Sequence, residues 1–113
     1  MTWPTRPSGP VSSPLAITST HAGETAICVA TGELDLATAG ELRDAVLATA
    51  PGNCRLRLDV SGITCIDSAG LSALLELHST LETAGVRLEI TAAEGPVRQA
   101  VQITGLSHLL AAT

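Results

Sequence analysis

The segment CRLRLDV, residues 54–60, is the feature that most narrows the folds open to this chain. Leu56, Leu58 and Val60 alternate with charged residues, which is the period of a strand with one covered face. A segment with helical spacing, TAGELRDAVLATA, precedes it, and another, LSALLELHSTL, follows it. Strands that alternate with helices are typical of a parallel sheet with right-handed crossover connections. We therefore predict an α/β domain.

The chain opens differently, with two apolar, β-branched runs joined by a short turn. LAITST and TAICVAT are separated by HAGE, and Gly23 in this turn suits a tight reversal between antiparallel strands. Before them, residues 1–14 contain four prolines among serine, threonine and glycine. We expect these residues to form a flexible tail, with Trp3 outside the core, and residues 15–113 to form a single domain.

The ends of the two longer predicted helices carry capping signals. Thr38 and Glu41 have the spacing of a capping box at the start of the first helix. Gly85 stands where the second helix would end in a left-handed cap. Four leucines of the second helix are expected to share its buried face: Leu71, Leu74, Leu75 and Leu81.

The last third of the chain supplies one more strand and one more helix. VRLEITA is predicted to be a strand, and PVRQAVQIT a short helix introduced by Glu94, Gly95 and Pro96 and ended by Gly105. GLSHLL closes the pattern as a terminal strand or a hooked segment. The predicted architecture is a small mixed, mostly parallel β-sheet packed with helices, which opens with a β-hairpin.

Composition argues against several classes of protein. The formal net charge is -5, so the chain lacks the positive charge on which binders of nucleic acid and anionic membranes depend. All six basic residues are arginines, which removes Schiff-base and P-loop lysine chemistry. No stretch has the apolar length of a membrane span or a signal peptide, so we expect a cytoplasmic location.

Cysteine usage points to no metal centre or redox pair. Cys28, Cys54 and Cys65 are widely spaced and form no CxxC pair, so we expect buried, reduced thiols. The sequence indicates no cofactor.

Acidic residues and one serine gather at the predicted carboxyl edge of the sheet, where open α/β sheets collect function. The residues concerned are Glu33 and Asp35 after the second strand, Asp59 near the end of the third, Asp67 and Ser68 before the second helix, and Glu94 after the fourth strand. The role of the Ser68 hydroxyl is the central question. A plain helix N-cap is one answer, although Asp67 is an equally good cap. Gly70 is poor inside a helix, and small neighbours would give a second macromolecule access to the hydroxyl.

Two chemical alternatives use the same edge. In the first, Ser68 is a hydrolase nucleophile, but Ile66 replaces the first glycine of a GxSxG elbow. The base would have to be one of the three histidines, His21, His78 and His108. Of these, only His108 is free to return to Ser68 in space. In the second, carboxylates hold a magnesium ion; the candidates are Asp35, Asp59 and Asp67.

Three motifs resemble the bacterial anti-sigma factor antagonist family, which shares the STAS domain (sulphate transporter and anti-sigma factor antagonist). They are TGELDLATAGELRDAV, LRLDVSGITCIDSAGLSALLEL and GPVRQAVQITGLSHLL, in family order and spacing between residues 15 and 110. The resemblance implies that Ser68 is a phosphorylated serine, with Asp67 before it and Asp35 close by. The expected partner-binding surface comprises Glu33, Asp35, Asp67, Ser68, Ala69 and Gly70.

The resemblance also implies a function without enzymatic activity. Members of this family bind an anti-sigma factor that is an ATP-dependent serine kinase, which releases the sigma factor; phosphorylation reverses binding, and a metal-dependent serine phosphatase restores it. A STAS module in another signalling scaffold or a transport assembly, or a small serine hydrolase, remain alternatives. Phenylalanine and tyrosine are absent, so aliphatic residues must fill the core. Many members continue into a further helix after the position of GLSHLL, so we expect that edge to be exposed or covered by a partner.

Overall fold

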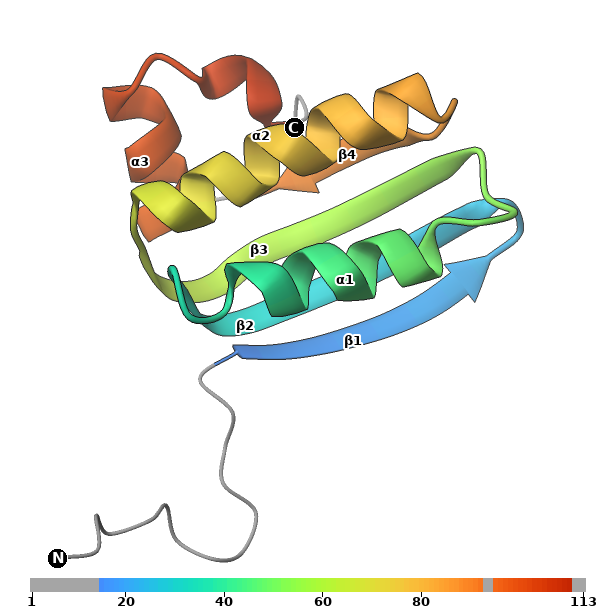
Figure 1. The fold of residues 1–113 in the computed structure, drawn as a ribbon, viewed down its shortest axis with the longest axis horizontal. Helices are drawn as coiled ribbons and strands as arrows, with labels where there is room; N and C mark the ends of the chain where they lie inside the picture. The colour runs from blue at the N-terminus through green and yellow to red at the C-terminus, as the bar shows by residue number, and fades with distance from the viewer. Residues whose placement is uncertain (1–14, 93–94, 111–113) are drawn as a thin grey trace, which may run out of the picture.

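The strands form one four-stranded sheet in which neighbours along the chain are also neighbours in space (Figure 1). A computed structural model describes residues 15–92 and 95–110. The tail predicted for residues 1–14, with Trp3, and the acidic residue Glu94 lie outside the described residues. Within those limits the predicted α/β architecture is confirmed.

The sheet is mixed and mostly parallel. Strand β1 (Leu15–Ala22) pairs antiparallel with β2 (Thr25–Leu34), and Gly23 takes a φ of 64° in the turn between them. Strand β3 (Arg55–Ile66) runs parallel to β2, and β4 (Arg87–Thr91) runs parallel to β3. The opening hairpin and the parallel pairing that follows it are both as the sequence predicts.

Two long helices lie side by side on one face of the sheet (Figure 1). They are α1 (Ala39–Thr49), which follows β2, and α2 (Ser68–Thr83), which follows β3. A shorter helix, α3 (Pro96–Ile103), and a 3-10 turn, η1 (Ser107–Leu109), follow β4. None of the helices described here is long and apolar enough to span a bilayer.

The closing segment is hooked rather than extended. After η1, Leu110 makes a single parallel bridge to Ile90 of β4. Of the two conformations predicted for GLSHLL, the structure therefore has the hooked one.

The core lies between the helices and the sheet and is built from aliphatic side chains. The alternation in β3 is confirmed, because Leu56, Leu58 and Val60 are buried while Arg55 and Arg57 are exposed. The helices contribute buried leucines and a valine that pack on these strands: Leu42 and Val46 from α1, and Leu71, Leu74, Leu77 and Leu81 from α2. The core of the described residues is thus filled by leucine, isoleucine, valine and alanine, without the aromatic residues found in many cores.

The predicted buried face of α2 was wrong at one position. Leu75 is 36% exposed, whereas Leu74 is fully buried. Successive residues of a helix are about 100° apart, and the buried face is centred on Leu74, Leu77 and Leu81, so Leu75 turns past its margin. The sequence offered two adjacent leucines, and only the packing of the whole helix chooses between them.

The C-terminal cap of α2 is confirmed, but the capping box of α1 is wrong. Gly85 has a φ of 81°, and Val86 N–H donates to Leu81 O at 2.8 Å, as in a Schellman motif. At α1, Thr38 is the N-cap residue but its side chain makes no cap hydrogen bond. The Thr38 hydroxyl turns back to the end of β2 instead, and Glu41 is left exposed.

Strand β3 is longer than the sequence suggests, which moves Asp59 away from the sheet edge. Asp59 pairs with Thr91, the last residue of β4, but β3 continues from there to Ile66. The prediction that Asp59 lies near the end of the third strand is therefore wrong. Serine and glycine at the start of SGITC interrupt the strand pattern, and register shifts between β2 and β3 accommodate the second half of the strand.

The prediction of buried thiols holds for one cysteine of three. Cys28 is buried in β2, whereas Cys54 and Cys65 are exposed. All three are free thiols. Cys65 lies where the pairing of β2 with β3 shifts register, next to the exposed residue Thr64.

Gly70, in the first turn of α2, is where this helix meets β2 most closely. A Cβ atom at Gly70 would clash with the carbonyl oxygen of Leu34 and lie 2.9 Å from the Leu34 Cγ. Gly70 is buried. The missing side chain thus reflects close packing of the helix on the strand, and the idea that it opens a path for a partner is not supported.

We therefore expect Gly70→Ala to lower the free energy of unfolding by about 1–3 kcal/mol, because backbone atoms must move to admit a methyl group. Gly40→Ala is the matched control, since a Cβ there would meet only Arg43 Nη2 at 3.7 Å. It should be neutral or stabilising by up to about 1 kcal/mol through helix propensity. Urea denaturation of both variants is the measurement, and equal effects would contradict the packing argument.

Candidate functional site

The candidate site is the end of the sheet where β2 and β3 finish together. Glu33 pairs with Cys65 and Leu34 with Ile66, so the loop before α1 and the start of α2 leave the sheet as neighbours. Figure 1 shows both segments at the same end of the domain. Parallel pairing of the two strands thus brings distant parts of the sequence to one edge.

A tight turn connects β2 to α1 and is held by Asp35 and Thr38. The Asp35 carboxylate accepts hydrogen bonds from the N–H groups of Ala37, at 3.0 Å, and Thr38, at 3.1 Å. The Thr38 side chain is almost fully buried; its hydroxyl accepts from Asp35 N–H at 2.9 Å and donates to Glu33 O at 2.8 Å. These hydrogen bonds fix the backbone conformation of the turn.

Asp67 joins this turn to α2. One carboxylate oxygen, Oδ1, accepts from Gly70 N–H at 2.9 Å and so caps the helix. The other, Oδ2, accepts from Leu36 N–H at 3.3 Å. The Asp67 backbone N–H also donates to Leu34 O at 3.3 Å. A single residue therefore ties the start of α2 to both the strand end and the loop of the neighbouring element.

Ser68 is the first residue of α2 and is exposed. Within the described part of the chain its hydroxyl has no hydrogen-bond partner, and Asp67 performs the capping. The interpretation of Ser68 as a plain N-cap is therefore wrong. The fold leaves this hydroxyl in solvent beside a capped helix N-terminus.

The structure brings five of the six predicted partner-binding residues together at the surface. Glu33, Asp67 and Ser68 are exposed, while Asp35 and Ala69 are half-buried. The sixth, Gly70, lies beneath them against β2. We call Glu33, Asp35, Asp67 and Ser68 the acidic edge, because its three charged side chains are all carboxylates.

The carboxylates proposed for a magnesium site do not converge. Asp59 lies eight residues before Asp67 along β3, which in an extended strand is roughly 26 Å. Its Oδ1 accepts from Ser61 N–H at 2.9 Å. Among the residues that the structure describes, no group of three or more His, Cys, Asp or Glu side chains is placed to hold a metal ion.

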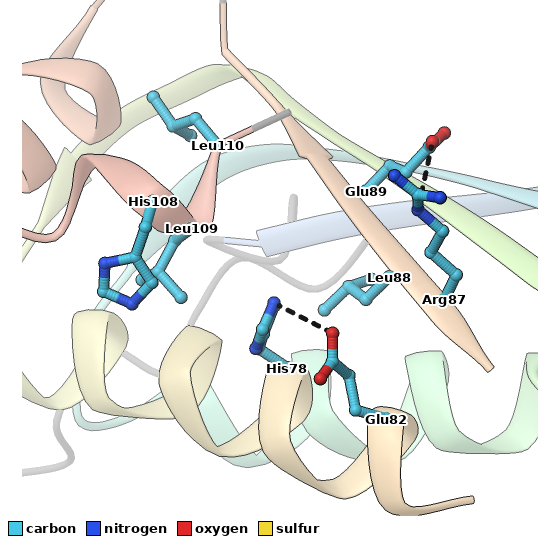
Figure 2. Close-up of a pocket in the computed structure, with 8 residues that line it drawn as sticks. All are labelled: His78, Glu82, Arg87, Leu88, Glu89, His108, Leu109 and Leu110. Carbon is cyan, nitrogen blue, oxygen red and sulfur yellow. Dashed lines mark ion pairs between the residues drawn. The ribbon is translucent and has the colours of Figure 1, made fainter. Parts of the chain in front are cut away.

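The histidines lie away from Ser68. His21 is at the hairpin end of β1, paired with Ala26. His78 lies ten residues along α2, about 15 Å from Ser68, and its Nε2 is 3.6 Å from Glu82 Oε1. His108 does return in space, but to a pocket that it shares with His78 and Glu82 (Figure 2). A serine nucleophile needs a base within hydrogen-bond reach, and none of these three histidines supplies one.

Sequence reasoning missed Leu36. This residue lies in the turn before α1 and is 80% exposed, although its N–H is bonded to Asp67. An apolar residue two positions after a strand looks like part of the core, and its hydropathy gave no sign of exposure. The one available signal was the residue before it, Asp35, a type that favours turns.

Residues 17–111 match the family model described as "Mlab, STAS domain". The chain belongs to the STAS domain family. The match runs from Ile17 within β1 through η1 and includes the acidic edge. Comparison with curated proteins gave no match.

Solved structures share the fold of this STAS domain. An anti-sigma factor antagonist from Mycobacterium paratuberculosis superposes with a TM-score of 0.75 at 24% identity, covering 91% of this chain and 86% of that chain. The anti-sigma factor antagonist SpoIIAA in its unphosphorylated form gives 0.66 at 23% identity, covering 87% and 89%. The Bacillus cell fate determinant SpoIIAA in its phosphorylated form gives 0.65 at 20% identity, covering 87% and 92%.

The capping geometry predicts that substitutions of two adjacent residues of this STAS domain have unequal effects on its stability. Asp67→Ala should lower the free energy of unfolding by about 1–2 kcal/mol, because it removes the acceptor for Gly70 N–H. Ser68→Ala should change it by no more than about 0.5 kcal/mol, since the hydroxyl is exposed and unbonded. Thermal or urea unfolding of the two variants measures the difference. A larger loss for Ser68→Ala would show that the serine is the cap.

Proposed function

We propose that this STAS domain is an anti-sigma factor antagonist that binds an anti-sigma factor serine kinase and releases the sigma factor. Phosphorylation of Ser68 switches it off, and a metal-dependent serine phosphatase switches it on again. The observation that carries the proposal is the free, exposed hydroxyl of Ser68 at a helix start that Asp67 already caps. Such a switch acts in the cytoplasm and needs no catalytic group of its own.

The likeness to known antagonists supports this proposal. Two of the solved structures named above are called anti-sigma factor antagonists, and one of these, SpoIIAA, also exists in a phosphorylated form. In this chain a hydroxyl that takes no part in the fold is available for the same modification. The long distance from Ser68 to His21 and His78 favours this role over a serine hydrolase.

The site can accept a phosphoryl group without unfolding. The first turn of a helix carries N–H groups that have no acceptor within the helix, and Asp67 occupies only that of Gly70. The positive end of the helix dipole also favours an anion at this position. We therefore expect the phosphorylated domain to keep its fold.

Phosphorylation instead changes the charge and shape of the surface. A phosphoryl group adds about 1.5 to 2 negative charges to an edge that already carries Glu33, Asp35 and Asp67. A partner that fits the unmodified edge then meets a larger group and a stronger negative potential. Both effects oppose binding, which is the behaviour that a partner switch requires.

The proposal predicts one modification at one residue. Incubation with purified anti-sigma factor kinases of the source organism, ATP and Mg²⁺ should add a single phosphate to Ser68, detected by mass spectrometry. Ser68→Ala should remove it. Ser72→Ala is the matched control, because Ser72 is also exposed and lies one helical turn further along α2.

Other outcomes would point to the remaining alternatives. Labelling of Ser68 by an active-serine probe would favour the hydrolase. Tight binding of a partner without any phosphorylation would favour a STAS module in a signalling scaffold or a transport assembly.

Binding should separate two variants of the same residue. Ser68→Ala is expected to bind the kinase as the wild type does, since the hydroxyl supports no structure. Ser68→Asp should weaken binding roughly tenfold, because it places a fourth carboxylate at the acidic edge. Isothermal titration calorimetry of both variants is the measurement. Equal dissociation constants would contradict an electrostatic switch.

A further inference from the structure

Few large apolar side chains of this domain are left in solvent. In the described part of the chain they are Val29 at 36% exposure, Leu36 at 80%, Leu75 at 36% and Ile103 at 84%. Single exposed apolar residues are normal on protein surfaces. Leu36 is different because it stands within the acidic edge and its backbone is held there.

The position of Leu36 is fixed from both sides. Its own N–H is bonded to Asp67 Oδ2 at 3.3 Å, and the next N–H, that of Ala37, is bonded to Asp35 Oδ1 at 3.0 Å. Thr38 then closes the turn on the end of β2. An apolar side chain on such a constrained turn loses little backbone entropy when a partner covers it.

Leu36 also lies close to Ser68. Its amide nitrogen is 3.3 Å from the carboxylate of Asp67, which is the residue next to Ser68 in the chain. Adjacent Cα atoms are about 3.8 Å apart, so Leu36 lies on the order of 10 Å from Ser68. A standard interface covers roughly 800 Å² of each partner, equivalent to a disc of about 16 Å radius. A protein centred on Ser68 therefore covers Leu36.

We propose that Leu36 is the apolar anchor of the contact with the serine kinase, held beside Ser68 by the Asp67 carboxylate. This inference rests on the proposed function and names the chemistry of its partner surface. Because Asp67 bonds the Leu36 N–H and Asp35 bonds the N–H of Ala37, two carboxylates flank Leu36, and the matching surface is an apolar pocket with a basic rim. Buried apolar anchors within a polar rim are typical of the residues that dominate binding energy.

The test compares Leu36 with another exposed apolar residue on a different surface. Leu36→Ala should raise the dissociation constant for the kinase by at least about tenfold and raise KM for phosphorylation of Ser68, while kcat at saturation stays near the wild-type value. Leu36→Met, which keeps the apolar volume, should restore most of the affinity.

Val29→Ala is the control. Val29 lies in the middle of β2 between the buried residues Cys28 and Ala30, so it points to the opposite face of the sheet from the helices. It should change the dissociation constant by less than about twofold. Circular dichroism melts of all variants check that each is folded.

Asp67→Asn tests the hydrogen bond that holds Leu36. The asparagine oxygen can still cap Gly70 N–H, but its NH₂ group cannot accept from Leu36 N–H. Amide hydrogen exchange should therefore accelerate at Leu36 and stay unchanged at Gly70. Unchanged exchange at Leu36 would show that Asp67 does not hold the loop.

The outcomes separate this inference from the proposed function. If the wild type is phosphorylated on Ser68 and Leu36→Ala binds within twofold of it, the anchor is wrong and the switch stands. If the kinases neither bind nor modify the wild type, the proposed function fails and the anchor fails with it.

Discussion

The site depends on one carboxylate that bonds two backbone N–H groups from different elements. Asp67 caps α2 through Oδ1 and holds the loop before α1 through Oδ2. Because the cap is supplied from the preceding residue, the hydroxyl of Ser68 takes no part in the helix start. The same carboxylate sets the distance between Ser68 and Leu36, and therefore the shape of the surface around the Ser68 hydroxyl.

That arrangement is possible only because the sheet delivers the two elements to the same place. Parallel pairing of β2 and β3 ends in register at Leu34 and Ile66, and Gly70 lets the first turn of α2 rest directly on Leu34. A larger residue at Gly70 would lift the helix start away from β2 and lengthen the bonds that join Asp67 to Leu36 N–H and to Leu34 O. The packing of Gly70 on Leu34 and the hydrogen bonds of Asp67 to β2 and its loop therefore depend on each other.

The sequence predicts the elements better than the details of the edge. Alternation in CRLRLDV and the helical spacing on each side of it define the layers, because burial imposes those periods directly. The extent of β3 was not predictable, since Ser61 and Gly62 interrupt the alternating pattern and the pairing with β2 includes register shifts. Ser68 and Asp67 are equally good caps by residue type, and only the contact with Leu36, far away in sequence, decides between them. The exposure of Leu36 and the true place of His108 likewise depend on tertiary contacts that no local pattern reports.

Under the proposed function, Ser68 is needed for regulation but not for folding, and this has a genetic consequence. Under the proposed function, loss of the hydroxyl at Ser68 gives a protein that folds, escapes proteolysis and reaches normal abundance, yet can no longer be turned off. Such an allele would be dominant over the wild-type copy, in contrast to the recessive loss expected when the core is damaged. Selection on Ser68 would therefore act through regulation and not through the stability of the fold.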